Sequence, residues 1–240
     1  MINTILFDLD GTLLPMDQDK FTKAYFTTLS QKTVPLGYDP SSLIKGIWLG
    51  TEAMVKNDGS KLNKDAFWDK FAELFGQQVY SHIGVFDKYY ENEFESVKAS
   101  CEPSDRPAKI IKKLRERGFS LVLATNPIFP SVATQRRIKW AGLDIDDFDL
   151  VTTYDNSCFC KPNPKYYEEI LAKIGKTANE CLMVGNDARE DVAAATLGTD
   201  IFLLTNCLIN KDNIDISRYN NGDFDALEKY LDALDAPGGK

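Results

Sequence analysis

Two carboxylates stand two residues apart at the end of a short apolar run near the start of the chain. Asp8 and Asp10 follow residues 5–7, which are typical of a buried strand of a parallel sheet, and Gly11 and Thr12 come directly after them. Ligands of open α/β sheets bind at the carboxyl ends of strands, where both aspartates would lie. Carboxylates held this close repel each other, and a hard divalent cation, best Mg2+, would remove that conflict. An ordinary surface turn is the alternative for this stretch taken alone.

A hydroxyl and an amide follow a second apolar run. Residues 119–124 predict a near-continuous buried strand, and Thr125, Asn126 and Pro127 end it. A hydroxyl together with backbone N–H groups at a strand end can hold phosphate oxygens. A simple strand-end turn is the alternative for these three residues.

A lysine precedes the expected start of a later helix. Lys161 is followed by Pro162, which rigidifies the approach, and by Pro164, which suits a first helical turn. A lysine beside several carboxylates would pair with the strand-end aspartate and offset the charge of a phosphate. A solvated surface lysine is the alternative.

A polar cluster also follows the predicted strand at residues 181–184. Asn186 and Asp187 come just after it, and Asp191 lies four residues further on. Successive residues point in different directions, so only one of Asn186 and Asp187 should face a cation directly. We expect it to be Asp187, directly or through water, because a carboxylate binds Mg2+ better than a neutral amide does. Asn186 would then contact solvent or backbone, Asp191 would orient the site, and a helix N-cap is the alternative for Asp187.

These four stretches occur in the order of the motifs of the haloacid dehalogenase-like (HAD) superfamily, which the chain resembles. The resemblance implies that Asp8 is a nucleophile that accepts a phosphoryl group and that Asp10 is a general acid/base. It also implies that Thr125 orients the phosphoryl group, that Lys161 belongs to the third motif, and that the fourth motif binds Mg2+. The fourth motif departs from the common family spelling, because Asn186 stands where an aspartate usually follows the glycine.

The remaining sequence predicts how these residues are positioned. Apolar residues recur at helical spacing across residues 15–103, which predicts a helical insertion. The resemblance implies that this insertion is a mobile cap. Residues 1–14 and 104–240 form the catalytic core, in which strands alternate with helices. We therefore expect an α/β fold, a doubly wound Rossmann-like parallel sheet core (HAD-like) with an inserted α-helical cap domain. Residues 236–240 are expected to be a frayed tail.

Composition and charge exclude several classes of protein. A net charge of −8 and a pI near 4.8 argue against nucleic acid as a partner. No apolar run approaches the ~20 residues that a membrane helix needs, and the N-terminal apolar stretch, interrupted by Asp8, does not resemble a signal peptide. Five cysteines without a repeating framework favour free thiols and a cytoplasmic protein.

The prediction is therefore an Mg2+-dependent phosphatase that hydrolyses a small-molecule phosphate monoester through an aspartyl-phosphate on Asp8. Its metal ligands would be Asp8, the backbone carbonyl of Asp10, and Asp187. The expected partner is a small phosphorylated metabolite, with no nucleic acid or membrane, and no oligomeric state is predicted. A phosphomutase or a non-catalytic phosphate-binding protein on the same scaffold stays open. A haloacid dehalogenase is disfavoured, because its chemistry needs no acid/base aspartate at the position of Asp10.

Overall fold

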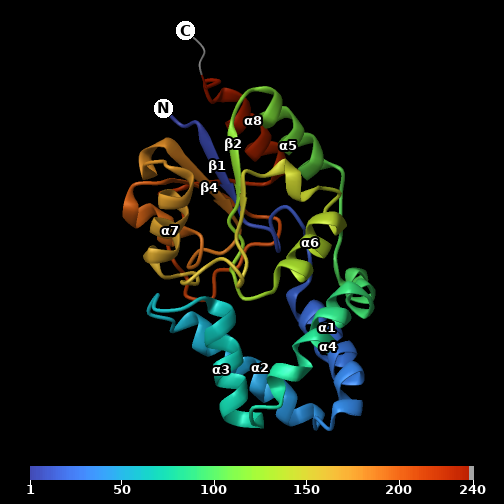
Figure 1. The fold of residues 1–240 in the computed structure, drawn as a ribbon. Coiled ribbons are helices and arrows are strands. Elements are labelled where there is room, and N and C mark those ends of the chain that lie inside the picture. The colour runs from blue at the N-terminus through green and yellow to red at the C-terminus, as the bar shows by residue number, and fades with distance from the viewer. Residues whose placement is uncertain (238–240) are drawn as a thin grey trace.

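One parallel sheet of six strands carries the fold in the computed structural model, which describes residues 1–237 (Figure 1). The strand order is β3-β2-β1-β4-β5-β6, and every neighbouring pair is parallel. Of the expected tail, residues 238–240 lie outside the described residues. The strands are β1 (Thr4–Phe7), β2 (Ser120–Leu123), β3 (Leu150–Val151), β4 (Cys181–Gly185), β5 (Asp200–Leu204) and β6 (Asn220–Gly222).

Helices cover both faces of this sheet, which explains why its central strands are apolar throughout. On β1, Ile5 and Phe7 belong to one buried cluster and Leu6 to another. Figure 1 shows α5 and α8 on one face and α7 on the other, as expected for a doubly wound α/β core. The α-helices that follow the inserted segment are α5 (Arg106–Glu116), α6 (Ser131–Trp140), α7 (Pro164–Ile174) and α8 (Phe224–Ala233), and the short 3-10 helices are η3 (Ile145–Asp147), η4 (Ala178–Glu180) and η5 (Val192–Leu197).

One element of the sheet differs from the sequence prediction. The edge strand β6 was not predicted, because its Asn-Asn-Gly sequence carries no apolar pattern. Backbone pairing with β5 alone makes it a strand, and pairing of that kind depends on a neighbour that is distant in sequence.

The inserted segment between β1 and α5 is helical and gathers at one end of the sheet (Figure 1). Buried aromatic rings hold its helices together, as the helical spacing predicts; Trp68 of α3 and Phe86 of α4, for example, have ring centroids 5.3 Å apart. Its helices are α1 (Gln18–Thr33), η1 (Val34–Leu36), α2 (Pro40–Val55), α3 (Asn63–Phe75), α4 (Val79–Glu91) and η2 (Glu93–Ser100). No helix in residues 1–237 combines the length and the hydropathy needed to cross a membrane.

The sheet topology determines where ligands can meet the protein. The chain runs from β1 outward to β2 and β3, and then returns to the other side of β1 to form β4. This reversal is the topological switch point at which open α/β sheets bind ligands. The carboxyl ends of β1, β2 and β4 meet there, and the inserted helices lie at that end of the sheet (Figure 1).

Candidate active site

The structure brings Asp8 and Lys161 together at the end of β1. The Lys161 ammonium donates to Asp8 Oδ1 at 2.9 Å and to Asp191 Oδ1 at 2.6 Å. The lysine is 1% exposed, so the alternative of a solvated surface lysine is wrong. Asn163 caps the following helix α7 by accepting the Lys165 N–H, which places the loop of Lys161 beside the strand ends.

Negative charge exceeds positive charge around this lysine. Burial raises the pKa of Asp8 to about 8, and the carboxylates of Asp191 and Asp10 add to that shift against the opposing effect of Lys161. Burial acts to lower the pKa of Lys161, but Asp191 and Asp8 raise it well above its usual range, so the lysine stays charged. The single positive charge of Lys161 is therefore shared by two buried carboxylates, those of Asp8 and Asp191. A further cation beside Asp8 would reduce the repulsion between them.

Asp10 is held by an arginine that the sequence analysis did not identify. Arg137 of α6 is 1% exposed and forms an ion pair with Asp10 Oδ2, while its guanidinium lies 4.4 Å from the ring centroid of Phe129. The other oxygen, Oδ1, is buried and has no hydrogen-bond partner within residues 1–237. Burial raises the pKa of Asp10, and Arg137 opposes that shift.

A signal for Arg137 was present in the sequence. It lies four residues after Ala133 and four before Ala141, both of which are buried, so helical spacing places its side chain on the inward face. An arginine on a buried face needs an anionic partner, which here is Asp10.

Asp191 organises the loop after β4. Its Oδ2 accepts the backbone N–H groups of both Asn186 and Asp187 at 2.9 Å, while its Oδ1 accepts Lys161. Gly185 makes this approach possible, since a Cβ there would lie 2.0 Å from Asp191 Oδ2. Asp191 thus touches both the loop and the lysine, which is the geometry that an orienting role requires.

Asn186 and Asp187 do point in different directions. The Asn186 side chain is enclosed by protein: its Oδ1 accepts the Thr12 hydroxyl at 3.0 Å, and its Nδ2 donates to the Cys207 carbonyl at 2.7 Å. Asp187 Oδ1 accepts the N–H groups of Arg189 and Glu190 at 2.8 and 2.9 Å. Asp187 therefore makes bonds typical of an N-cap, and its Oδ2 is the atom that could face a cation.

Thr125 and Asn126 lie at the end of β2, beside the same site. The backbone carbonyl of Thr125 accepts the hydroxyls of Thr152 and Tyr166, which fixes the strand end. Asn126 Nδ2 donates to both carboxylate oxygens of Glu190 at 3.1 Å. This nitrogen can therefore donate to a phosphate only if its hydrogen bonds to Glu190 are broken. Burial raises the pKa of Glu190 to about 7. Glu190 is a second residue that the sequence analysis did not identify.

These residues open into one cavity of about 570 Å³ between the sheet and helix α2. Asp191 does not line the cavity, although Lys161, to which it is bonded, does; Trp48, Thr51 and Val55 line it from α2. The predicted site residues that line it are Asp8, Asp10, Thr125, Asn126, Lys161, Asn186 and Asp187.

The cavity suits a cation that needs few protein ligands. No three Asp, Glu, His or Cys side chains within the described residues are arranged around a single metal position. Mg2+ keeps several waters and is commonly held by one or two carboxylates together with substrate phosphate. Asp8 and Asp187 supply two carboxylates to this cavity, and the charge excess around Asp8 favours a divalent ion. The donor set therefore fits Mg2+.

The sequence of the chain is similar to the sequences of known hydrolases. Residues 2–197 match the family model described as haloacid dehalogenase-like hydrolase. The chain is 25% identical over 239 residues to pyrophosphatase PpaX from Halalkalibacterium halodurans, covering 100% of this chain and 98% of that protein.

Solved structures show the same fold. A HAD phosphatase from Thermococcus onnurineus has a TM-score of 0.61 at 20% identity, covering 98% of this chain and 100% of that one. YfnB from Bacillus subtilis, in its magnesium-bound form, has a TM-score of 0.56 at 19% identity, covering 96% and 98% of the two chains. The family match spans most of the chain and includes all four motifs, so the protein belongs to the haloacid dehalogenase-like hydrolases.

Proposed function

We propose that the protein is an Mg2+-dependent phosphatase that hydrolyses a small-molecule phosphate monoester through an aspartyl-phosphate. The observation that carries the proposal is Asp8, a buried carboxylate at a strand end whose neutralising ammonium, Lys161, lies 2.9 Å away. Asp8 Oδ2 is not bonded to that ammonium and is the atom we assign to attack phosphorus. A P–O bond forms to Asp8 as the P–O bond to the alcohol breaks.

Asp10 supplies the proton transfers in this proposal. Its buried Oδ1 has no partner in residues 1–237 and belongs to a side chain that lines the cavity, so it can approach the leaving oxygen. In its protonated form it donates to the departing alcohol. As a carboxylate it then takes a proton from the water that attacks the aspartyl-phosphate. Burial raises the pKa of Asp10, which favours the protonated form needed for the first step.

Lys161 and Mg2+ would share the task of neutralising charge. Asp8, the backbone carbonyl of Asp10 and Asp187 are the residues we assign to hold the ion. When bound, Mg2+ offsets the negative charge of a phosphate that lies beside carboxylates, which is the principal requirement of phosphoryl transfer. Thr125 lies at the cavity wall, where its hydroxyl could orient a phosphate oxygen.

Pyrophosphate is the second candidate substrate. A relative that aligns over the full length of the chain is a pyrophosphatase by name, and Arg189 and Lys211 line the same cavity as Asp8 and could contact a second phosphate. The first substrate would release an alcohol and the second would release phosphate, so the product distinguishes the two candidates.

We further propose residues 15–103 as the cap and residues 1–14 and 104–240 as the catalytic core. The two connections between them meet side by side, since the Glu102 N–H donates to the Pro15 carbonyl at 2.7 Å. A cytoplasmic location also remains a prediction; it rests on five cysteines that are all free thiols in the structure.

A screen of phosphorylated metabolites with and without Mg2+ tests the function. Wild-type protein should release inorganic phosphate from at least one monoester, and Asp8→Asn should abolish the release while circular dichroism shows that the variant is folded. Isomerised phosphate product in place of free phosphate would indicate a mutase. Tight binding of a phosphate ligand without turnover would indicate a binding protein, and release of halide from a 2-haloacid would indicate a dehalogenase.

A second test uses the acid role of Asp10. Asp10→Asn should slow hydrolysis of an alkyl phosphate far more than that of an aryl phosphate, because an aryl oxide needs less protonation as it leaves. Equal losses with both leaving groups would remove Asp10 from the acid role.

A further inference from the structure

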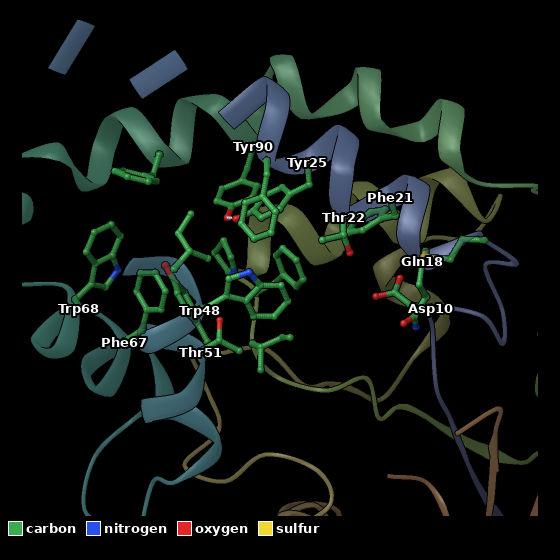
Figure 2. Close-up of a pocket in the computed structure, with 18 residues that line it drawn as sticks. Asp10, Gln18, Phe21, Thr22, Tyr25, Trp48, Thr51, Phe67, Trp68 and Tyr90 are labelled. Carbon is green, nitrogen blue, oxygen red and sulfur yellow. Dashed lines mark hydrogen bonds between the residues drawn. The ribbon is translucent and has the colours of Figure 1, made fainter. Parts of the chain in front are cut away.

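A second cavity, of about 240 Å³, opens from the active site into the cap. Figure 2 shows Asp10 and Gln18 at one end, Phe67 and Trp68 at the other, and Tyr25 and Trp48 between them. Aromatic rings from all four cap α-helices and one core loop form most of its wall: Phe21, Tyr25, Trp48, Phe67, Tyr90 and Phe129.

This cap cavity is continuous with the site of Asp8. Asp10, Gln18, Trp48 and Thr51 line both cavities. Trp48 stands where they join and is 54% exposed, which is unusual for a large apolar side chain. A flat ring at this junction can stack against a ligand that extends from one cavity into the other.

The position of Asp10 determines which part of a substrate enters the cap cavity. A phosphate at Asp8 lies in the first cavity, next to Lys161. The proposed acid, Asp10, must contact the oxygen that leaves phosphorus, and Asp10 forms the end wall of the cap cavity (Figure 2). Asp10 lines both cavities, so a leaving oxygen beside it lies where the cavities join, and the group attached to that oxygen can extend into the cap cavity.

The wall of this cavity is unsuited to an anion. Of the described residues that line it, Asp10 is the one that carries charge; no lysine, arginine or histidine takes part. The nearby guanidinium of Arg137 is already paired with Asp10. A charged group transferred from water into such surroundings lacks a counter-ion, whereas an apolar ring gains from leaving water.

Resting on the proposed phosphatase function, we propose that the cap cavity is the leaving-group site and that the substrate is the phosphate monoester of an uncharged alcohol with an aromatic-sized apolar body. The inference concerns the part of the substrate that departs, and it selects against pyrophosphate, whose leaving group is an anion.

Four substrates of graded chemistry test the proposal in the presence of Mg2+: benzyl, 2-hydroxyethyl and 4-carboxybenzyl phosphate, and pyrophosphate. Benzyl phosphate should exceed 2-hydroxyethyl phosphate in kcat/KM by about 10-fold or more, because burial of the ring stabilises its bound state. The added carboxylate of 4-carboxybenzyl phosphate should lower kcat/KM by about 100-fold, because nothing in the cavity neutralises it. Similar values for benzyl and 2-hydroxyethyl phosphate, or pyrophosphate as the best substrate, would overturn the inference.

Two matched variants of helix α1 locate the effect in the cap cavity. Thr22 lines this cavity and not that of Asp8, whereas Thr27 is exposed on the same helix. Thr22→Asp should reduce the benzyl preference about 10-fold, since it places a carboxylate in the apolar wall. Thr27→Asp adds the same charge toward solvent and should leave the preference intact. If the two variants behave alike, the ring does not bind in the cap cavity.

A binding measurement separates this inference from the proposed function. Asp8→Asn prevents turnover, so calorimetry can compare benzyl and 4-carboxybenzyl phosphate as ligands. Tighter binding of benzyl phosphate by about 10-fold or more supports the inference even if the wild type hydrolyses no monoester. Absence of hydrolysis would refute only the proposed phosphatase function. Equal binding of the two would overturn the inference, whatever the wild-type activity.

Discussion

The ion pair between Arg137 and Asp10 offers a quantitative test of how the site is built. Arg137→Met removes the guanidinium and keeps an unbranched side chain of similar length. The arginine is 1% exposed and the Asp10 side chain 23% exposed, so the variant leaves a largely buried carboxylate without its counter-charge. Breaking a buried pair from one side costs about 3–5 kcal/mol, and the partial exposure of Asp10 favours the lower end, about 3 kcal/mol of unfolding free energy.

A double-mutant cycle separates the ion pair from the other contacts of Arg137. The guanidinium also lies over the Phe129 ring, a contact worth about 0.5–2 kcal/mol that is lost whether or not Asp10 is charged. In an Asp10→Asn background Arg137 is itself a buried charge without its partner, so the Arg137→Met change removes an uncompensated charge and should cost about 1 kcal/mol or less. The expected interaction energy between the two residues is the difference, about 2 kcal/mol or more.

Urea denaturation of the wild type, both single variants and the double variant measures the four free energies of unfolding. Arg137→Lys is the matched control, since it restores the charge without the planar group that contacts Asp10 and Phe129; it should recover part of the loss. The reasoning is refuted if Arg137→Met costs the same in both backgrounds, because the arginine would then act through packing alone.

Three further predictions follow from other parts of the structure. Asp187→Asn should raise the Mg2+ concentration for half-maximal activity far more than Asn186→Ala does, and the reverse ranking would make Asn186 the ligand. The cap should move relative to the core, which spin-label distances between the two parts can measure. Asn63 of α3 donates to the carbonyls of Pro127 and Phe159, so Asn63→Ala should widen the spread of those distances. One fixed distance in both wild type and variant would refute both expectations. Hydrogen bonds from Thr177 lower the pKa of Glu180 from 4.5 to about 2, so the stability that Glu180 contributes is present above pH 4.5 and is lost as pH falls toward 2. The difference in unfolding free energy between wild type and Glu180→Gln should therefore shrink as pH falls over that range. A difference that stays constant would contradict this linkage.

The sequence by itself was sufficient for the fold class and for the outline of the site. Apolar strands that end in polar residues predict a parallel sheet, and the carboxyl ends of its central strands must meet at one edge because all strands run the same way. This local rule brought Asp8, Thr125 and Asn186 to one edge without knowledge of the strand order. The third-motif lysine could be predicted for a similar reason, since the two prolines after it fix the path of a short loop into a helix.

Only the tertiary structure shows which polar atoms of these residues are already hydrogen-bonded within the protein and which are available to a ligand. Asn186 and Asp187 are adjacent in sequence, and only the packing of Thr12 and Cys207 around Asn186 shows that its amide is enclosed. The bond from Arg137 to Asp10 joins residues 127 positions apart, so no local pattern contains it.

The cap cavity also depends on the tertiary structure. Helical spacing predicts that the aromatic residues of the cap face inward, but it cannot distinguish a ring packed in a core from a ring that lines a cavity. That difference depends on how four helices and the loop of Phe129 come together around Asp10. The catalytic edge follows from strand direction, which the sequence encodes locally, whereas the shape of the leaving-group site follows from long-range packing, which it does not.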